Sequence, residues 1–174
     1  MLEIRKMIVS DWAAVAEIYK EGIATGMATF ETEIPSWELW DKNHIVSCRL
    51  VAVNGDYMLG WAALSEVSSR CVYGGVAEVS VYVGNKARGH GIGESLLGQL
   101  IVDSEKQGYW TLQSGIFPEN LASINLHKKL GFRKIGYREK IAQLDGVWKD
   151  NILMEKRSKK RFYIKPGVTN NKNL

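Results

Sequence analysis

The stretch from Glu78 to Ile101 constrains the fold most, because it predicts a strand, a glycine-rich turn and a helix in succession. Its first part, up to Val83, alternates valines with Ser80 and Tyr82, a pattern typical of a strand. The part after the turn carries leucines and isoleucines at helical spacing. A helix that begins among glycines presents bare backbone N–H groups and the positive end of its dipole. Such a turn can bind phosphate.

The spacing within this turn excludes two common phosphate-binding motifs. A P-loop requires a lysine where the chain has His90, and the dinucleotide fingerprint requires a glycine where it has Glu94. What is present is Arg-x-x-Gly-x-Gly, at Arg88, Gly91 and Gly93. The glycines alone are also consistent with plain helix packing, whereas strand, arginine and helix together favour a phosphate site.

Composition places the 174-residue chain among single-domain globular proteins, with 45% hydrophobic and 24% charged residues. The net charge of +4 is modest and concentrated in residues 156–161, so we expect no nucleic-acid partner. Cys48 and Cys71 are isolated in the sequence, which predicts free thiols and no metal site. The N-terminus has no apolar leader and no stretch approaches a membrane span, so we expect a cytoplasmic protein without membrane partners.

Hydrophobic periodicity and turn signals predict the remaining elements. Asn54-Gly55 and Asp145-Gly146 are hairpin signals. We assign residues 1–156 to one domain and residues 157–174 to a basic, flexible tail. The other expected strands cover residues 2–8, 50–53, 57–64, 110–114, 132–144 and 147–154, and the other expected helices cover residues 12–24, 37–45 and 118–129.

The resulting order, β-αα-βββ-α-β-α-ββ, together with the turn from Arg88 to Gly93, resembles the GNAT family of N-acetyltransferases over residues 2–156. The resemblance implies an α/β (α+β) fold, with a mixed central sheet of about seven strands flanked by four helices. It also implies acetyl-CoA as co-substrate, a small-molecule amine as acetyl acceptor and a homodimer. Five stretches resemble the phosphinothricin or methionine sulfoximine N-acetyltransferase branch: Ala28–Thr32, Arg70–Tyr73, Glu78–Val83, Asn120–Ser123 and Leu126–Phe132.

Acetyl transfer to an amine requires a group that takes a proton from the ammonium, and the resemblance gives this role of catalytic base to Glu78. On the residues alone, an exposed strand carboxylate is the plainer interpretation. Strand parity places Glu78 with Ser80 and Tyr82, opposite the valines, so it can line a cleft. The proton donor to the leaving sulfur stays open between Tyr82, water and His127, which stands where many family members have a tyrosine.

The resemblance also assigns contacts with the coenzyme, and for three of these residues the sequence supports a simpler role as well. Asn120 is equally suited to be the N-cap of its helix, Lys129 to be a solvated helix lysine, and His90 to be a surface histidine. The expected coenzyme-binding residues are Val81, Tyr82, Val83, Arg88, Gly89, His90, Gly91, Ile92, Gly93, Glu94, Asn120 and Lys129.

The resemblance places the amine substrate between two loops, around Phe30 and around Arg70. Arg70 can form a bidentate pair with a carboxylate of the substrate, whereas Phe30 is equally suited to core packing. Gly74 replaces a bulkier residue and Val147 stands where an arginine is usual before Trp148, so the identity of the substrate stays open. The expected substrate-binding residues are Phe30, Glu31, Arg70, Cys71, Val72 and Tyr73.

Three functions are consistent with these features. The first is N-acetylation of a small amino acid or analogue, such as methionine sulfoximine, methionine sulfone or phosphinothricin. The second is acetylation of a peptide, polyamine or antibiotic amine; the lack of an acidic cluster ranks polycationic substrates lower. The third is a non-catalytic module that binds coenzyme A.

Overall fold

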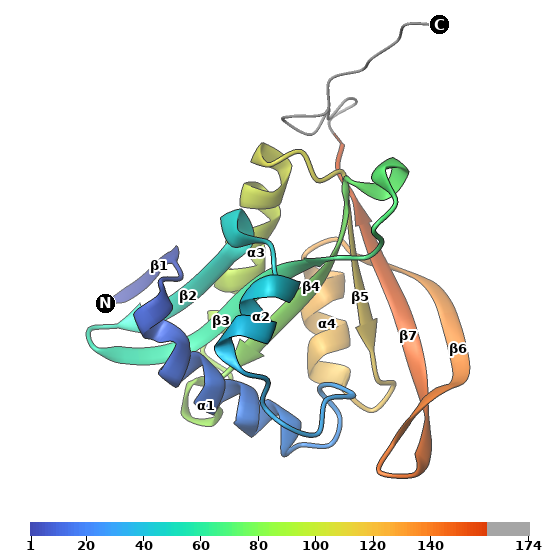
Figure 1. Cartoon of the computed structure of the whole chain (residues 1–174), viewed down its shortest axis with the longest axis horizontal. Helices are drawn as coiled ribbons and strands as arrows, with labels where there is room; N and C mark the ends of the chain where they lie inside the picture. The colour runs from blue at the N-terminus through green and yellow to red at the C-terminus, as the bar shows by residue number, and fades with distance from the viewer. Residues whose placement is uncertain (160–174) are drawn as a thin grey trace, which may run out of the picture.

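Seven strands form one sheet in the order β1-β2-β3-β4-β5-β7-β6, and helices cover both of its faces (Figure 1). The computed structural model describes residues 1–159. The order of the elements along the chain agrees with the predicted one, so the predicted fold class is confirmed. The strands are β1 (Leu2–Lys6), β2 (Arg49–Asn54), β3 (Tyr57–Glu66), β4 (Val76–Val83), β5 (Thr111–Ile116), β6 (Arg133–Leu144) and β7 (Val147–Arg157); the helices are α1 (Trp12–Ile23), α2 (Trp37–Asn43), α3 (Ile92–Lys106) and α4 (Leu121–Lys129).

The central strand β4 has two differently paired edges. It pairs antiparallel with β3 from Ala77 to Val83, but parallel with β5 only from Val76 to Glu78, which lies opposite Gln113. Beyond that row β4 and β5 separate, although both strands continue. The last five residues of β4 therefore have a neighbour on one edge only.

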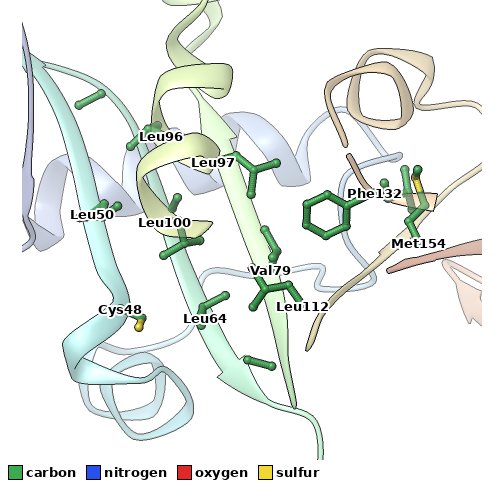
Figure 2. Close-up of a cluster of buried hydrophobic side chains, with 14 of the residues drawn as sticks. Cys48, Leu50, Leu64, Val79, Leu96, Leu97, Leu100, Leu112, Phe132 and Met154 are labelled. Atoms are coloured by element: carbon green, nitrogen blue, oxygen red, sulfur yellow. The ribbon is translucent and has the colours of Figure 1, made fainter. Parts of the chain in front are cut away.

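The face of the sheet under α3 and α4 carries an aliphatic core. Figure 2 shows Leu96, Leu97 and Leu100 of α3 directed at the strands, where Leu50, Leu64 and Val79 meet them. The three leucines and Leu64 are fully buried. Burying one such side chain contributes about 1.5–3 kcal/mol, so this layer fixes α3 and its first turn against β4.

The opposite face, under α1 and α2, is aromatic instead. Tyr82 of β4 stacks on Trp61 with ring centroids 4.7 Å apart and meets Tyr19 of α1 edge-on at 4.9 Å. Trp61 also packs against Trp40 of α2 at 5.6 Å. These contacts place α1 and the chain that follows it across the C-terminal half of β4, where Tyr82 lies.

Both predicted hairpin turns are present, but one of them begins one residue later than the sequence predicts. The predicted hairpin at Asp145-Gly146 is present, and both residues have positive φ values of 49° and 78°. At the other hairpin, Asn54 is still part of β2, so Gly55 and Asp56 form the turn, with Gly55 at φ 58°. The later turn lets Asn54 pair with Tyr57 at the end of the ladder.

The last strand is longer than predicted. β7 continues through Arg157, whose Nη1 donates to the carbonyl of Trp110 at 3.0 Å, and Ser158 Oγ donates to Glu105 Oε1 at 2.7 Å. Residues 160–174 of the predicted tail lie outside the described residues. Within residues 1–159, no helix is long and apolar enough to span a membrane.

Candidate active site

A cleft of about 770 Å³ opens where β4 and β5 separate. Its walls come from β4, the turn before α3, β5, β6, β7, the start of α4 and the loop after α1. The predicted base and most of the predicted coenzyme turn therefore meet in one place. The predicted site residues that line the cleft are Phe30, Glu78, Val81, Tyr82, Val83, Arg88, Gly89, Gly91, Ile92, Gly93, Glu94 and Asn120.

Other predicted site residues do not line this cleft within the described chain. Arg70 packs its guanidinium over the ring of Tyr73 at 5.6 Å, in an exposed 3-10 turn that includes Cys71 and Val72. Glu31 is exposed and its N–H donates to Thr29 Oγ1 at 3.0 Å. Their roles in substrate binding stay predictions, as do those of His90 and Lys129 toward the coenzyme.

The unpaired edge of β4 turns specific backbone groups toward the cleft. Gly84 and Leu59 lie opposite each other at the end of the β3–β4 ladder. The N–H of Gly84 donates to Leu59 O at 2.9 Å, so these two residues form a hydrogen-bonded pair. Because hydrogen-bonded and non-hydrogen-bonded pairs alternate in an antiparallel ladder, Tyr82 is bonded to β3. Val81 and Val83 thus point their N–H and C=O groups away from β3, to the cleft side.

The turn before α3 leaves the start of that helix without a cap from the protein. Gly91, its N-cap residue, has φ 76° and offers no side chain, so the N–H groups of the first turn have no intrahelical partner. A Cβ on Gly93 would lie 3.3 Å from Leu126 Cδ2 and 3.5 Å from Val83 Cγ2. Arg88 Nε donates to Val83 O at 3.3 Å, which leaves its other guanidinium nitrogens for an anion. The turn suits a phosphate-bearing ligand.

Asn120 combines the simpler predicted role with a second one. Its Oδ1 accepts from the N–H of Ser123 at 3.1 Å, so it caps α4, and its Nδ2 donates to Met27 O at 3.2 Å. It thereby ties the loop after α1 to the start of α4. Lys129, at the other end of α4, pairs with Glu94 Oε2 at 2.6 Å; both side chains are exposed, so the pair stabilises little.

Glu78 lies on the last row of β4 that pairs with β5, at the point where the cleft begins. Its side chain shares a face with those of Ser80 and Tyr82. Among the described residues, no side chain forms an ion pair or hydrogen bond with this half-buried carboxylate. It is therefore available to a ligand, beside a wall where Phe30 meets Phe117 edge-on at 4.7 Å.

Two further groups at the cleft are neutral. His127 is 2% exposed, and its Nδ1 donates to Ser123 O at 2.8 Å. Burial lowers the pKa of this imidazole, so Nε2 carries a lone pair rather than a proton, and no described protein group donates to it. The packed position of Tyr82 raises the pKa of its phenol far above the usual range, so this hydroxyl keeps its proton.

The cleft residues that sequence reasoning missed include Arg138 of β6 and Asn151 of β7. Asn151 had a detectable signal, because it is an amide in the middle of a strand that is otherwise apolar or charged. Arg138 had none, since the sequence contains many arginines and lysines and strand register alone brings this one to the cleft.

Comparison with known proteins agrees with this geometry. The model of the Acetyltransferase (GNAT) family matches residues 12–132. An L-methionine sulfoximine/L-methionine sulfone acetyltransferase of Pseudomonas aeruginosa is 28% identical over 158 residues, covering 87% of this chain and 92% of that protein. The phosphinothricin N-acetyltransferase of Alcaligenes faecalis is 29% identical over 163 residues, covering 88% and 81%.

A solved structure shows the same similarity. The GNAT superfamily phosphinothricin acetyltransferase of Sinorhizobium meliloti, in complex with acetyl-CoA, superimposes with a TM-score of 0.81. The two chains are 28% identical, and the match covers 90% of this chain and 88% of that one. Because the family model matches residues 12–132 and the cleft lies beside a helix start without a cap, the chain belongs to the Acetyltransferase (GNAT) family and is an acetyl-CoA-dependent N-acetyltransferase.

Proposed function

We propose that this enzyme acetylates the α-amino group of a small amino acid or analogue, of the type of methionine sulfoximine, methionine sulfone or phosphinothricin, with Glu78 as general base. The observation that carries the proposal is the position of Glu78, a half-buried carboxylate with no described protein partner, at the row where β4 and β5 separate. The names of the P. aeruginosa and A. faecalis relatives support this class of substrate.

The coenzyme would lie along the part of the cleft next to α3. When bound, acetyl-CoA supplies an acetyl thioester whose carbonyl carbon accepts the amine nitrogen and whose C–S bond then breaks. The bare N–H groups at the start of α3 and the side chain of Arg88 would hold its pyrophosphate. The N–H and C=O groups of Val81 and the N–H group of Val83 would hydrogen-bond its pantetheine amides and fix the thioester in place. An N–H there is also suited to stabilise negative charge on the carbonyl oxygen.

Glu78 would take the proton that the ammonium must lose before its nitrogen can attack. A carboxylate held by no other protein group is free to do so, directly or through one water. The leaving sulfur also needs a proton. In the state described, His127 has none to give at Nε2, which leaves the Tyr82 hydroxyl or solvent as its source.

The test is a panel of amines assayed for thiol release from acetyl-CoA. We expect turnover of methionine sulfone or sulfoximine, and we expect Glu78→Gln to lower kcat by about 100-fold or more, with the affinity for acetyl-CoA unchanged. The matched control is Glu155→Gln, which removes an equal charge from the same sheet outside the cleft. Turnover of peptides or polyamines alone would reject the substrate class, and an unchanged kcat in Glu78→Gln would reject the base.

We further propose that the enzyme is a cytoplasmic homodimer. Several large apolar side chains of the β6–β7 hairpin are exposed, including Trp148, Val147 and Tyr137, which suits a subunit interface. The free cysteines Cys48 and Cys71 suit a reducing compartment. Light scattering is expected to give twice the chain mass of 19.6 kDa; a mass of one chain at micromolar concentration would contradict the dimer.

A further inference from the structure

Arg138 and Asn151 are among the polar residues of the cleft that have no part in the reaction described above. Arg138 and Asn151 face each other directly across the β6–β7 ladder, so their side chains lie on the same face of the sheet. Both line the cleft, together with Glu78. The strand order places them on the far side of β5 from Glu78. The region between Glu78 and this pair is therefore bounded by polar groups on both sides.

Asn151 lacks a partner that its burial demands. It is 7% exposed, and among residues 1–159 no protein group donates to its Oδ1. A buried amide oxygen without a donor costs free energy, so such groups are rare unless a ligand satisfies them. The neighbouring strand is shaped around it, because a Cβ on Gly115 would lie 2.9 Å from Asn151 Nδ2.

Arg138 is an exposed cation that has no counterion within residues 1–159. No carboxylate of the described chain lies within ion-pair distance of its guanidinium, whereas Arg133 on the same strand pairs with Glu155 at 3.0 Å. A planar guanidinium is well matched to two carboxylate oxygens. The β6–β7 register shifts between Arg138 and Ala142, and Lys140 has φ 47° there. This irregularity follows Arg138 directly and interrupts the ladder at the cleft.

We infer that Arg138 and Asn151 recognise the amine substrate: Arg138 binds its carboxylate, and Asn151 Oδ1 accepts a hydrogen bond from its amino group. The inference rests on the proposed function and makes it more specific, because it requires the substrate to carry an amine and a carboxylate close together. It also assigns the carboxylate to Arg138, an exposed residue that lines the cleft, instead of Arg70, which is exposed as well but does not line the cleft. The selected substrates are thus α-amino acids rather than simple amines.

The experiment compares methionine sulfone with its carboxamide, using the full-length enzyme and acetyl-CoA. For the wild type we expect kcat/KM to be about 10- to 100-fold higher for the acid than for the amide. In Arg138→Gln this preference should disappear, through a higher KM for the acid and little change for the amide. Arg133→Gln removes an equal charge from the same strand outside the cleft and should keep the preference.

Asn151→Leu tests the second contact. It removes the amide at similar volume, so a merely structural Asn151 with an unpartnered oxygen would leave activity intact and the melting temperature equal or higher. We expect instead a KM for methionine sulfone raised about tenfold or more, at unchanged acetyl-CoA affinity and melting temperature. Asn151→Asp, which retains an oxygen acceptor, should restore most of the affinity for the amine.

The outcomes separate this inference from the function on which it rests. If the wild type acetylates no carboxylate-bearing amine, the proposed substrate class and the recognition pair are both overturned. If it acetylates methionine sulfone but Arg138→Gln slows the acid and the amide equally, only the role of Arg138 is overturned. If Asn151→Leu binds methionine sulfone as the wild type does, the role of Asn151 is overturned.

Discussion

Helices α3 and α4 both begin at the cleft, but their first turns are built in opposite ways. The N-cap of α4 is Asn120, whose side chain accepts from the N–H of Ser123, so this helix satisfies its own start. The N-cap of α3 is Gly91 in the left-handed region, with no side chain to accept anything. A helix end is open to an anion only where the protein has not already filled it.

The comparison explains why one helix start is suited to the coenzyme and the other is suited to hold the wall of the cleft. At α3 the N–H groups face a space next to Val83 and Leu126 that a single Cβ on Gly93 would narrow. At α4 the cap residue Asn120 also donates from Nδ2 to Met27 O, and this hydrogen bond fixes the loop after α1 at the cleft. Four predictions test this difference, in order of decreasing effect.

The largest effect is expected from filling the bare start of α3. Gly91→Asp places a carboxylate where the phosphates would lie, so it competes for the same N–H groups and repels the ligand. We expect acetyl-CoA affinity to fall about 100-fold by calorimetry, a loss of about 2.7 kcal/mol. Asn120→Asp adds the same charge at the start of α4 and keeps a good cap, so it should weaken binding less than tenfold. Equal losses in both variants would mean that the two helix starts do not differ.

A smaller effect is expected from the arginine of the same turn. Arg88→Gln removes a cation that lines the cleft, and we expect acetyl-CoA to bind about tenfold more weakly at low salt. The loss should shrink as salt rises, because screening weakens the wild-type contact too. Lys86→Gln, an exposed neighbour outside the cleft, is the control and should bind as the wild type does. A salt-independent loss would argue against a phosphate contact.

The third prediction concerns the capped helix. Asn120→Ala removes the acceptor for Ser123 N–H and the donor to Met27 O, so the free energy of unfolding should fall by about 1 kcal/mol in urea titrations. Ser36→Ala, at the similarly capped start of α2, provides the scale. Gly91→Ala removes no cap, so any loss of stability there must come from strain at φ 76° instead. An unchanged stability in Asn120→Ala would show that the cap is redundant.

The smallest effect is the pH dependence of stability that His127 of α4 contributes. Burial lowers the pKa of His127 below its unfolded value of about 6.5, so the unfolded chain binds the proton more tightly. The unfolded state then gains protons first, and stability should decline as pH falls below about 6.5. His127→Gln should flatten the part of this slope that His127 contributes, leaving the part from His44, whose pKa burial also lowers. An identical slope in wild type and variant would remove His127 as a contributor.

Local sequence patterns were sufficient to predict the helices and strands and one part of the site, the turn before α3. Alternation in Glu78 to Val83, the glycines before α3 and the Asp145-Gly146 signal specify conformations that depend on near neighbours along the chain. The resemblance carried by these stretches then indicated the family, and the family match confirmed it. The turn from Arg88 to Gly93 was recognisable for the same reason, because a helix start is a local structure.

Tertiary structure decided which of the predicted residues share a cleft and which others join them. Arg70 and Tyr73 lie in an exposed turn outside it, whereas Arg138 and Asn151 enter it through the β6–β7 register. That register and the early end of β4–β5 pairing depend on contacts between distant segments, so no local pattern encodes them. The sequence by itself determined a helix that starts among glycines next to Arg88; packing of the sheet determined what lies opposite it.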